Sequence, residues 1–212
     1  IAVHTGVDPV RFERGDGAQR GFFETPGGPR ELVFDRVLLA VGRSPNVEGL
    51  GLEALGIGLS PGGTIAVDDF LRTRIPTIYA CGDVVGPYQF THAASHQAWH
   101  ATVNALFGPF KRFAVDYRVL PWTTYTDPEI ARVGLNEQDA RDRGVRHEVT
   151  RFELGDLDRA ITAGETEGFI KILTAPGKDR ILGATVMAPH AGELISTIAL
   201  AMRSDIGMNR LL

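Results

Sequence analysis

The residues best suited to bind a ligand end an apolar run, Thr77-Ile-Tyr-Ala-Cys-Gly-Asp83. Open α/β sheets bind ligands at the carboxyl ends of their strands, which is where this pattern places a glycine and a carboxylate. Gly82 lets the backbone approach a ligand closely, and Asp83 can accept hydrogen bonds from polyol or ribose hydroxyls. Gly-Asp is also a common turn pair on protein surfaces, so this motif alone leaves both interpretations open.

A second motif, Ala40-Val-Gly-Arg-Ser-Pro-Asn46, leads from an apolar segment into a Pro-Asn turn. The apolar segment Val37–Val41 is continuous and of strand length, which is typical of strands buried on both faces of a parallel sheet. Between the two motifs lies Val67-Asp-Asp-Phe-Leu-Arg-Thr73. Each motif is a weak signal alone, whereas the three in this order are a specific one.

The histidines His92, His96 and His100 stand four residues apart in a segment predicted to be helical from about residue 92 to 106. They therefore form one stripe, and neutral imidazoles at this spacing can bind zinc. The alternative is a helix whose histidines meet separate surroundings. We favour the alternative and expect no metal site.

Two further candidates have structural explanations. Cys81 is the only cysteine, which excludes an internal disulfide, a Cys-x-x-Cys motif and a thiolate zinc cluster, and we expect it to be an inert core thiol. His190 and Glu193 are close enough for an acid–base pair, but they lie at the start of a predicted helix. We therefore expect them to cap that helix or to contact another subunit.

The first half of the chain is predicted to contain short strands and many turns. Residues 1–45 indicate a small antiparallel meander with Gly- and Pro-rich turns at 15–17 and 26–29, followed by the strand 37–41. Residues 46–79 are loop-rich. The short elements expected there are a helix at 50–55 and strands at 64–67 and 77–80.

The pattern changes after a connector at residues 111–119, and we place a domain boundary near residue 115. Asn136 is a plausible helix N-cap, with Asp139 three residues later and Gly144 as the stop. Strands are predicted at 129–135, 147–152, 168–174 and 180–188, with a final helix at 191–204. Strands joined mostly as hairpins, with helices packed on them, make an α+β unit.

The composition excludes several classes of protein and of binding partner. The 212 residues are 43% hydrophobic and 23% charged with a net charge of −4, as in ordinary globular proteins. There is no basic stripe and no apolar run of about 20 residues, so nucleic acid and membranes are not expected partners. A single cysteine fits a reducing compartment, and we expect a cytoplasmic location. Both ends interrupt a pattern, so we expect a fragment.

The ordered series Val-Gly-Arg-x-Pro-Asn, Asp-x-x-x-Arg-Thr and Ile-Tyr-Ala-Cys-Gly-Asp resembles the flavoprotein pyridine nucleotide-disulfide oxidoreductases. This family includes dihydrolipoamide dehydrogenase, glutathione reductase and mercuric reductase. The resemblance extends from about residue 30 to the end of the chain. Its downstream blocks are Thr126–Leu135, Asp158–Ala160, Gly164–Lys171, Arg180–Ala184 and Pro189–Ile195.

The resemblance implies an α/β and α+β fold in three parts. Residues 1–45 would be the end of an NAD(P)-binding domain, and residues 46–115 the C-terminal portion of an FAD-binding domain. Residues 116–212 would be an α+β interface domain with an antiparallel sheet, truncated at its C-terminus. This last part would form a homodimer. The residues indicate the same, because one small sheet cannot cover every apolar face of the last helix, so its stripe Leu194, Ile198, Ala201 and Met202 would face the partner subunit. The alternative is that the stripe packs inside its own domain.

The resemblance also implies cofactor-binding roles, with FAD and NAD(P)H as cofactors. Asp83 would hold the ribityl chain of FAD, and Gly82 would pass close to its polyol or phosphates. The backbone near Thr91, His92 and Ala93 would approach the flavin ring, where the positive end of the helix favours negative charge. Gly42 and Arg43 would lie where the NAD(P) and FAD domains meet.

Several family features are missing, so we assign no catalytic residue. The chain lacks both G-x-G-x-x-G fingerprints and the redox-active Cys-x-x-x-x-Cys, and the His-x-x-x-x-Glu pair would fall just beyond Leu212. The expected parent enzyme passes hydride from NAD(P)H via FAD to a disulfide-type or metal-ion acceptor, while this chain alone is inactive. The small-molecule substrate and the choice between NADH and NADPH stay open. The alternatives are a non-catalytic homodimerisation module and a family member without the cysteine pair.

Overall fold

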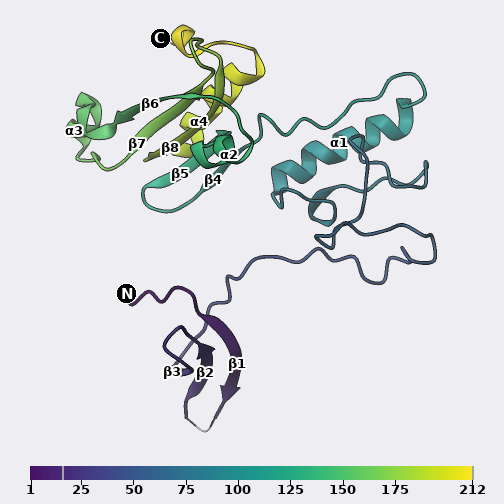
Figure 1. Cartoon of the computed structure of the whole chain (residues 1–212), viewed down its shortest axis with the longest axis vertical. Coiled ribbons are helices and arrows are strands. Elements are labelled where there is room, and N and C mark those ends of the chain that lie inside the picture. Colours follow the sequence, from purple (N-terminus) through teal and green to yellow (C-terminus); the bar gives the residue numbers. More distant parts are fainter. Residues whose placement is uncertain (16, 212) are drawn as a thin grey trace. The chain divides into compact units, whose positions relative to one another are not determined.

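The structure is a computed structural model that describes residues 1–15 and 17–211. These residues form two compact units, Ile1–Ser44 and Pro45–Leu212 (Figure 1). The division falls inside the motif 40–46, so Gly42 and Arg43 belong to the first unit.

The first unit contains an antiparallel sheet in the order β1-β2-β3, made of β1 (Asp8–Arg14), β2 (Gln19–Glu24) and β3 (Arg30–Phe34). Phe12 joins the three strands, because its ring meets Phe23 and Phe34 edge-on at centroid distances of 5.9 and 6.1 Å. The predicted meander is therefore confirmed. The predicted turn at 15–17 includes residue 16, which lies outside the described residues.

The segment Val37–Val41 is not a strand, which corrects the sequence-based prediction. Its side chains are exposed, with Leu38 at 90% and Val41 at 84% of full accessibility. An apolar run forms a strand only when neighbouring strands satisfy its backbone groups. Among the described residues no strand pairs with this run, so its composition alone does not produce one.

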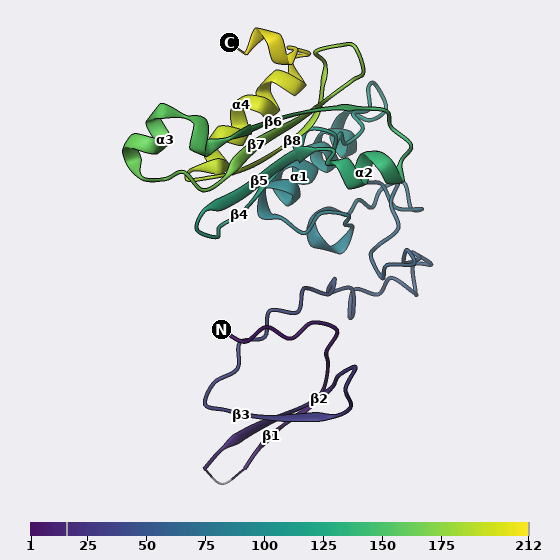
Figure 2. The same ribbon diagram turned by 60° about the vertical axis from the view of Figure 1, so that its left-hand side comes forward.

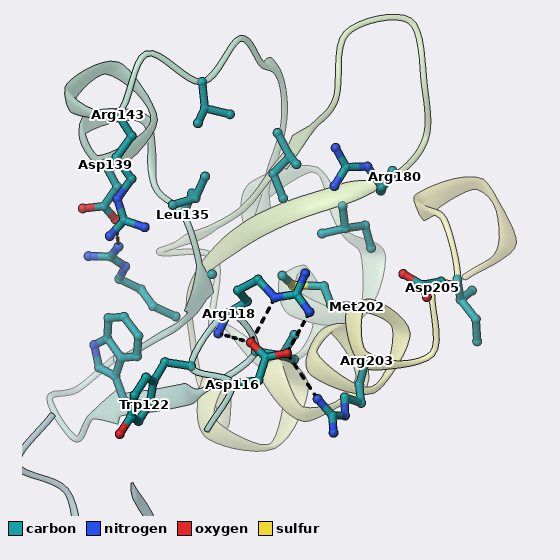
Figure 3. Close-up of a pocket in the computed structure, with 18 of the residues that line it drawn as sticks. Asp116, Arg118, Trp122, Leu135, Asp139, Arg143, Arg180, Met202, Arg203 and Asp205 are labelled. Atoms are coloured by element: carbon teal, nitrogen blue, oxygen red, sulfur yellow. Dashed lines mark hydrogen bonds and ion pairs between the residues drawn. The ribbon is translucent and has the colours of Figure 1, made fainter. Parts of the chain in front are cut away.

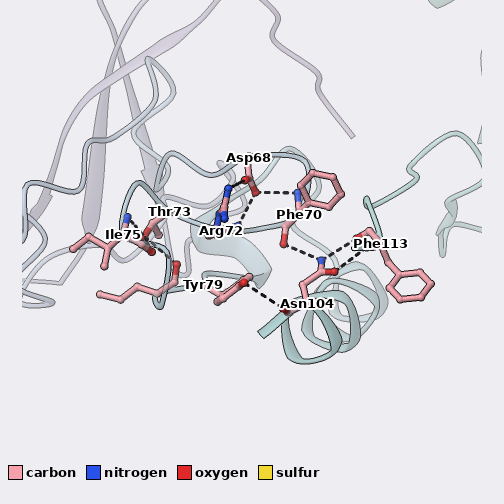
Figure 4. Close-up of polar contacts among 9 residues, drawn as sticks. Asp68, Phe70, Arg72, Thr73, Ile75, Tyr79, Asn104 and Phe113 are labelled. Atoms are coloured by element: carbon pink, nitrogen blue, oxygen red, sulfur yellow. Dashed lines mark hydrogen bonds and ion pairs between the residues drawn. The ribbon is translucent and has the colours of Figure 1, made fainter. Parts of the chain in front are cut away.

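The second unit begins with turns where short elements are predicted. Residues 50–55 form turns rather than a helix, and the predicted strands at 64–67 and 77–80 are reduced to the single bridges Leu59–Ile65 and Arg72–Tyr79. Short polar side chains compete for the backbone here. Asp68, for example, accepts hydrogen bonds from the backbone N–H groups of Phe70 and Arg72 (Figure 4).

The helix predicted at 92–106 is confirmed as α1 (Thr91–Phe107). Asn104, only 2% exposed, holds its last turn to two loops. The Asn104 amide nitrogen donates to the carbonyls of Phe70 and Phe113 at 3.1 and 2.9 Å, and its oxygen accepts from the Phe113 N–H at 2.8 Å (Figure 4). The Tyr79 hydroxyl donates to the Asn104 carbonyl. In this region, hydrogen bonds from side chains hold the loops in place of regular pairing between strands.

The rest of the unit is an antiparallel sheet in the order β4-β5-β8-β7-β6. This confirms the predicted fold class and adds one strand, β4, that the sequence pattern did not indicate. The strands are β4 (Pro121–Thr124), β5 (Glu129–Gly134), β6 (Glu148–Glu153), β7 (Phe169–Thr174) and β8 (Ile181–Ala188). The helices are α2 (Glu137–Asp142), α3 (Asp158–Ala163) and α4 (Ala191–Arg203).

The predicted N-cap of α2 is confirmed. The Asn136 side chain accepts the Asp139 N–H at 2.7 Å, and the Asp139 carboxylate accepts the Asn136 N–H at 3.1 Å. This reciprocal pair satisfies two donors that a helix N-terminus otherwise leaves unpaired. Gly144 follows with a φ of +64°, a conformation that favours glycine, and the helix stops there.

The core of the sheet lies under α4, which packs along one of its faces and contacts β8, β5 and β4 (Figure 2). Ile195, Ile198 and Ala201 are between 1% and 8% exposed and belong to this core. The prediction that Ile198 and Ala201 face a partner subunit is therefore wrong, since their own sheet covers them. Leu194 and Leu200 remain 44% and 65% exposed.

The contacts of Asn104 predict a large loss of stability on truncation. In Asn104→Ala, the Phe113 N–H and the half-buried carbonyls of Phe70 and Phe113 lose their partners, so the free energy of unfolding should fall by roughly 2–4 kcal/mol. Leu106→Ala is the matched control, because Leu106 is 65% exposed on the same helix and should change stability by less than about 0.5 kcal/mol. Urea unfolding followed by circular dichroism measures both. Equal midpoints for the two variants would contradict this role.

Candidate functional site

The strongest sequence candidates lie in the loop that precedes α1. Gly82 begins the short 3₁₀ helix η1 (Gly82–Val84) and has a φ of +82°. It is buried, and a Cβ built on it would stand 3.4 Å from the Cβ of Ala94 in α1. A glycine is required here both for the backbone conformation and for the close approach to α1.

Gln97 holds this loop in place from inside α1 and is fully buried. Its side-chain oxygen accepts the Gly82 N–H at 2.6 Å, and its nitrogen donates to the Gly86 carbonyl at 3.1 Å. The same nitrogen donates to the Tyr117 hydroxyl at 2.7 Å. One amide therefore fixes both ends of the segment that carries Asp83 and ties it to the connector before β4.

Sequence reasoning missed Gln97, although a signal existed. Gln97 lies four residues from both Ala93 and Ala101, and all three residues are on the buried face of α1. A polar residue on such a face nearly always has hydrogen-bond partners, so its position pointed to a network. Tyr117 belongs to this network, and burial raises the pKa of its hydroxyl, which therefore stays neutral near pH 7.

The N-terminus of α1 is the second part of the site. Its N-cap residue, Phe90, is extended and provides no side-chain cap, and the first turn contains no acidic residue. The first N–H groups of a helix have no partner within it and carry partial positive charge. The amides of Thr91, His92 and Ala93 thus have no partner within the helix; Thr91 and His92 are exposed, whereas Ala93 is buried. The short helix η1, which contains Asp83, packs against the same helix.

Aromatic rings surround this helix start. Phe90 stacks on His92 at a centroid distance of 5.4 Å and on Trp122 at 6.0 Å, and Tyr88 lies 5.9 Å from Trp122. The His92 ring nitrogen Nε2 lies 2.8 Å from the Pro121 carbonyl, at hydrogen-bond distance. The start of α1 is therefore attached to β4, which fixes the position of the first turn.

The three histidines of α1 have different surroundings. His92 meets Pro121, whereas the Nδ1 atom of His100 lies 3.0 Å from the His96 carbonyl. Burial, together with the neighbouring His100, lowers the pKa of His96. Within residues 1–15 and 17–211, no group of three or more His, Cys, Asp or Glu side chains is arranged to hold a metal ion.

The other candidates have structural surroundings of their own. Cys81 is half-buried rather than part of the core, because it lies in the irregular segment before η1. His190 precedes α4 in a left-handed conformation and makes no side-chain cap. The carboxylate of Glu129 instead accepts the Gly192 N–H at 2.9 Å, so the capping expected of His190 is supplied from β5.

Gly42 and Arg43 lie in the first unit, in the exposed segment after β3. Gly42 has a φ of +104°, and a Cβ there would meet no atom within 4 Å. Glycine is therefore needed at this position for its backbone angle rather than for close packing. Their place at a meeting of two cofactor domains stays a prediction.

Comparison with known proteins shows the family to which the chain belongs. Residues 1–98 match the sequence profile described as pyridine nucleotide-disulphide oxidoreductase, and residues 120–211 match the profile of its dimerisation domain. The chain belongs to the pyridine nucleotide-disulphide oxidoreductase family. The resemblance recognised in the sequence motifs is therefore confirmed.

Individual members of the family are similar over most of this chain. A dihydrolipoyl dehydrogenase of Chlamydia muridarum is 39% identical over 173 residues, which are 82% of this chain and 37% of that protein. A mercuric reductase of Acidithiobacillus ferrooxidans is 35% identical over 211 residues, covering 100% of this chain and 37% of that protein. The chain thus spans less than half the length of these relatives.

Solved structures give the same result for the fold. LpdA from Mycobacterium tuberculosis superposes with a TM-score of 0.82 at 30% identity, covering 93% of this chain and 42% of that one. The HOCl-induced flavoprotein disulfide reductase RclA from Escherichia coli superposes with a TM-score of 0.78 at 26% sequence identity, covering 94% of this chain and 45% of that one. The predicted combination of a partial cofactor-binding domain and an antiparallel interface domain is confirmed.

The hydrogen bonds of Gln97 predict a local effect in this family member. In Gln97→Leu, the Gly82 N–H and the Gly86 carbonyl lose buried partners, which should cost about 1–3 kcal/mol of stability. Hydrogen–deuterium exchange of the Gly82 amide should accelerate by at least about tenfold, since local opening becomes easier. Ser95→Ala is the control, because Ser95 is exposed on the same helix and bonds only to the Thr91 carbonyl. Unchanged exchange at Gly82 would refute the role of Gln97.

Proposed function

We propose that this chain is the C-terminal portion of a flavoprotein that passes hydride from NAD(P)H via FAD to a disulfide-type or metal-ion acceptor. The observation that carries the proposal is the Asp83 loop, which Gln97 holds beside the uncapped N-terminus of α1. The names of the relatives, dihydrolipoyl dehydrogenase and mercuric reductase, support acceptors of these two kinds. The whole protein would therefore be an oxidoreductase with a small-molecule substrate.

The domain assignment is part of the same proposal. Residues 1–45 would end an NAD(P)-binding domain, residues 46–115 would complete an FAD-binding domain, and residues 116–212 would form the interface domain. The division of the structure after Ser44 and the dimerisation-domain match at 120–211 support these limits. Gly42 and Arg43 would then lie at the junction of the first two domains.

The residues present fit one part of FAD. Asp83 offers a carboxylate that can accept hydrogen bonds from ribityl hydroxyls, and the buried Gly82 keeps the backbone in the required conformation. The amides of Thr91, His92 and Ala93 would face the flavin ring, where the positive end of α1 stabilises negative charge. FAD, when bound, supplies the two-electron chemistry between nicotinamide and acceptor.

The proposal requires chemistry from outside these 212 residues. Cys81 cannot cycle between dithiol and disulfide by itself, so a redox cysteine pair and an acid–base pair would come from other parts of the protein. The chain alone would be inactive. We also propose a cytoplasmic location on the basis of its cysteine content; among the described residues, no helix is long and apolar enough to cross a membrane.

Asp83 provides the direct test of FAD binding. In the full-length protein, Asp83→Ala should weaken FAD binding by roughly 10- to 100-fold, because a charged hydrogen bond worth about 1.5–3 kcal/mol is lost. Flavin fluorescence during titration of the apoprotein measures the dissociation constant. Asp156→Ala is the control, since Asp156 lies in the short helix after β6 and should leave the constant unchanged. The same dissociation constant for Asp83→Ala and wild type would remove Asp83 from the site.

The family match of residues 120–211 predicts a homodimer. The chain should sediment in analytical ultracentrifugation at about twice its mass of 23.0 kDa at tens of micromolar. Leu200→Asp should weaken the dimer, because Leu200 is a large exposed apolar side chain on α4. Val33→Asp is the control, with a similar exposure of 64% outside residues 116–212. A wild-type chain that sediments as a monomer would exclude this assembly.

A further inference from the structure

A pocket of about 530 Å³ lies in the second unit, and neither Asp83 nor the residues Thr91, His92 and Ala93 line it. It shares Tyr88, Tyr117 and Trp122 with the surroundings of α1. It is enclosed by the connector 116–119, the helix α2 and the ends of β5, β8 and α4 (Figure 3). Pockets that bind small molecules typically have volumes of roughly 300–1,000 Å³. The size is therefore suited to a small metabolite.

The pocket is basic, although the chain as a whole is acidic. Its lining contains five arginines and three aspartates, an excess of two positive charges in a chain with a net charge of −4. The arginines are Arg118, Arg132, Arg143, Arg180 and Arg203, and the aspartates are Asp116, Asp139 and Asp205. An excess of positive charge in a concave site attracts anions.

Two of the aspartates hold arginines in place. The Asp116 carboxylate accepts two hydrogen bonds from Arg118, at 3.0 and 2.8 Å, and a third from Arg203 at 3.4 Å. The hydrogen bonds from Arg118 lower the pKa of Asp116 to about 2, so it stays ionised at neutral pH. Asp139 pairs with Arg132 in the same way. These ion pairs place three of the five arginines beside the two carboxylates.

Two arginines of the pocket make no direct side-chain bond, and one nitrogen of a third has no partner. Arg143 and Arg180 are exposed and make no side-chain hydrogen bond or ion pair with any described residue, and Figure 3 shows them on opposite sides of the pocket. The guanidinium of Arg132 pairs with Asp139, but its buried Nε atom has no hydrogen-bond partner among the described residues. A buried donor of this kind is normally satisfied, and an anionic ligand would supply its acceptor and form charge-assisted hydrogen bonds with Arg143 and Arg180.

The remaining lining is aliphatic, with Leu135, Ile181 and Met202, and aromatic, with Tyr88, Tyr117 and Trp122. We infer that the pocket binds a small molecule with at least two anionic groups, phosphoryl or carboxylate, on a compact body. Two anionic groups are required because Arg143 and Arg180 approach from opposite sides. Both kinds of group match the planar fork of a guanidinium. This inference goes beyond the proposed function, since it uses neither Asp83 nor the N-terminus of α1.

Calorimetric titration of the chain at low ionic strength tests the site, with inorganic pyrophosphate and citrate as separate probes. We expect at least one of them to bind with a dissociation constant below about 1 mM. The probe that binds tighter identifies the phosphoryl or the carboxylate class. Binding should weaken as salt is added, because screening reduces the attraction between the anion and the arginines.

The double variant Arg143→Gln/Arg180→Gln should weaken binding at least about tenfold, since both available guanidinium groups are removed. Arg146→Gln is the matched control, because Arg146 is exposed close to Arg143 but does not line the pocket. Thermal unfolding should be the same for all three proteins. Since these arginines are exposed, their loss should also leave FAD binding by the full-length protein unchanged, which separates this test from that of the proposed function.

Two results would overturn the inference. One is that neither probe binds the wild-type chain at about 10 mM, a concentration at which even a weak site fills. The other is an unchanged affinity in the double variant, which would place the bound anion elsewhere. A loss of FAD binding in Asp83→Ala with unaltered pyrophosphate or citrate affinity would support two independent sites.

Discussion

The buried amide of Gln97 is the interaction on which the candidate site depends. An amide without partners in an interior costs about 1–3 kcal/mol, so a fully buried glutamine persists only where the surrounding backbone satisfies it. Here the partners are the Gly82 N–H, the Gly86 carbonyl and the Tyr117 hydroxyl. Burying this amide therefore also determines the conformation of the loop. If Gly82 or Gly86 took another position, the Gln97 amide would lose a hydrogen bond.

The same principle explains why α1 lies where it does without a large apolar face. The buried residues of α1 are small or polar. Gln97 in its middle and Asn104 near its end both bind neighbouring loops through side-chain hydrogen bonds. Apolar packing tolerates small displacements, whereas hydrogen bonds depend on direction and fix an element more tightly. A helix whose N-terminal amides must face a cofactor benefits from such fixation, and the stacking of Phe90 on His92 and Trp122 extends it to the first turn.

How much of the structure the sequence could predict differed along the chain. The sheet and α4 were predictable because local patterns determine them: alternating apolar residues pair within the chain, and Asn136 with Asp139 forms a capping box from neighbouring residues. The conformation of the run Val37–Val41 could not be predicted, because a strand buried on both faces requires neighbouring strands that no local pattern reveals. Ile198 was misassigned for a related reason, since periodicity locates an apolar face but does not say which surface covers it.

In the candidate site, motif order located Gly82 and Asp83, but the contacts of Gln97 span 11 to 20 residues and exist only in the folded chain.

The connector before β4 relates the candidate site to the basic pocket. Tyr117 accepts the hydrogen bond of Gln97, while the adjacent Asp116 and Arg118 form the ordered charge cluster of the pocket. Neighbouring residues of one short segment thus contact two different sites. Tyr117 also lines the pocket, so the hydroxyl that satisfies Gln97 and the carboxylate that binds Arg118 are supplied by consecutive residues. The connector is therefore held from two directions, by a buried amide and by ion pairs.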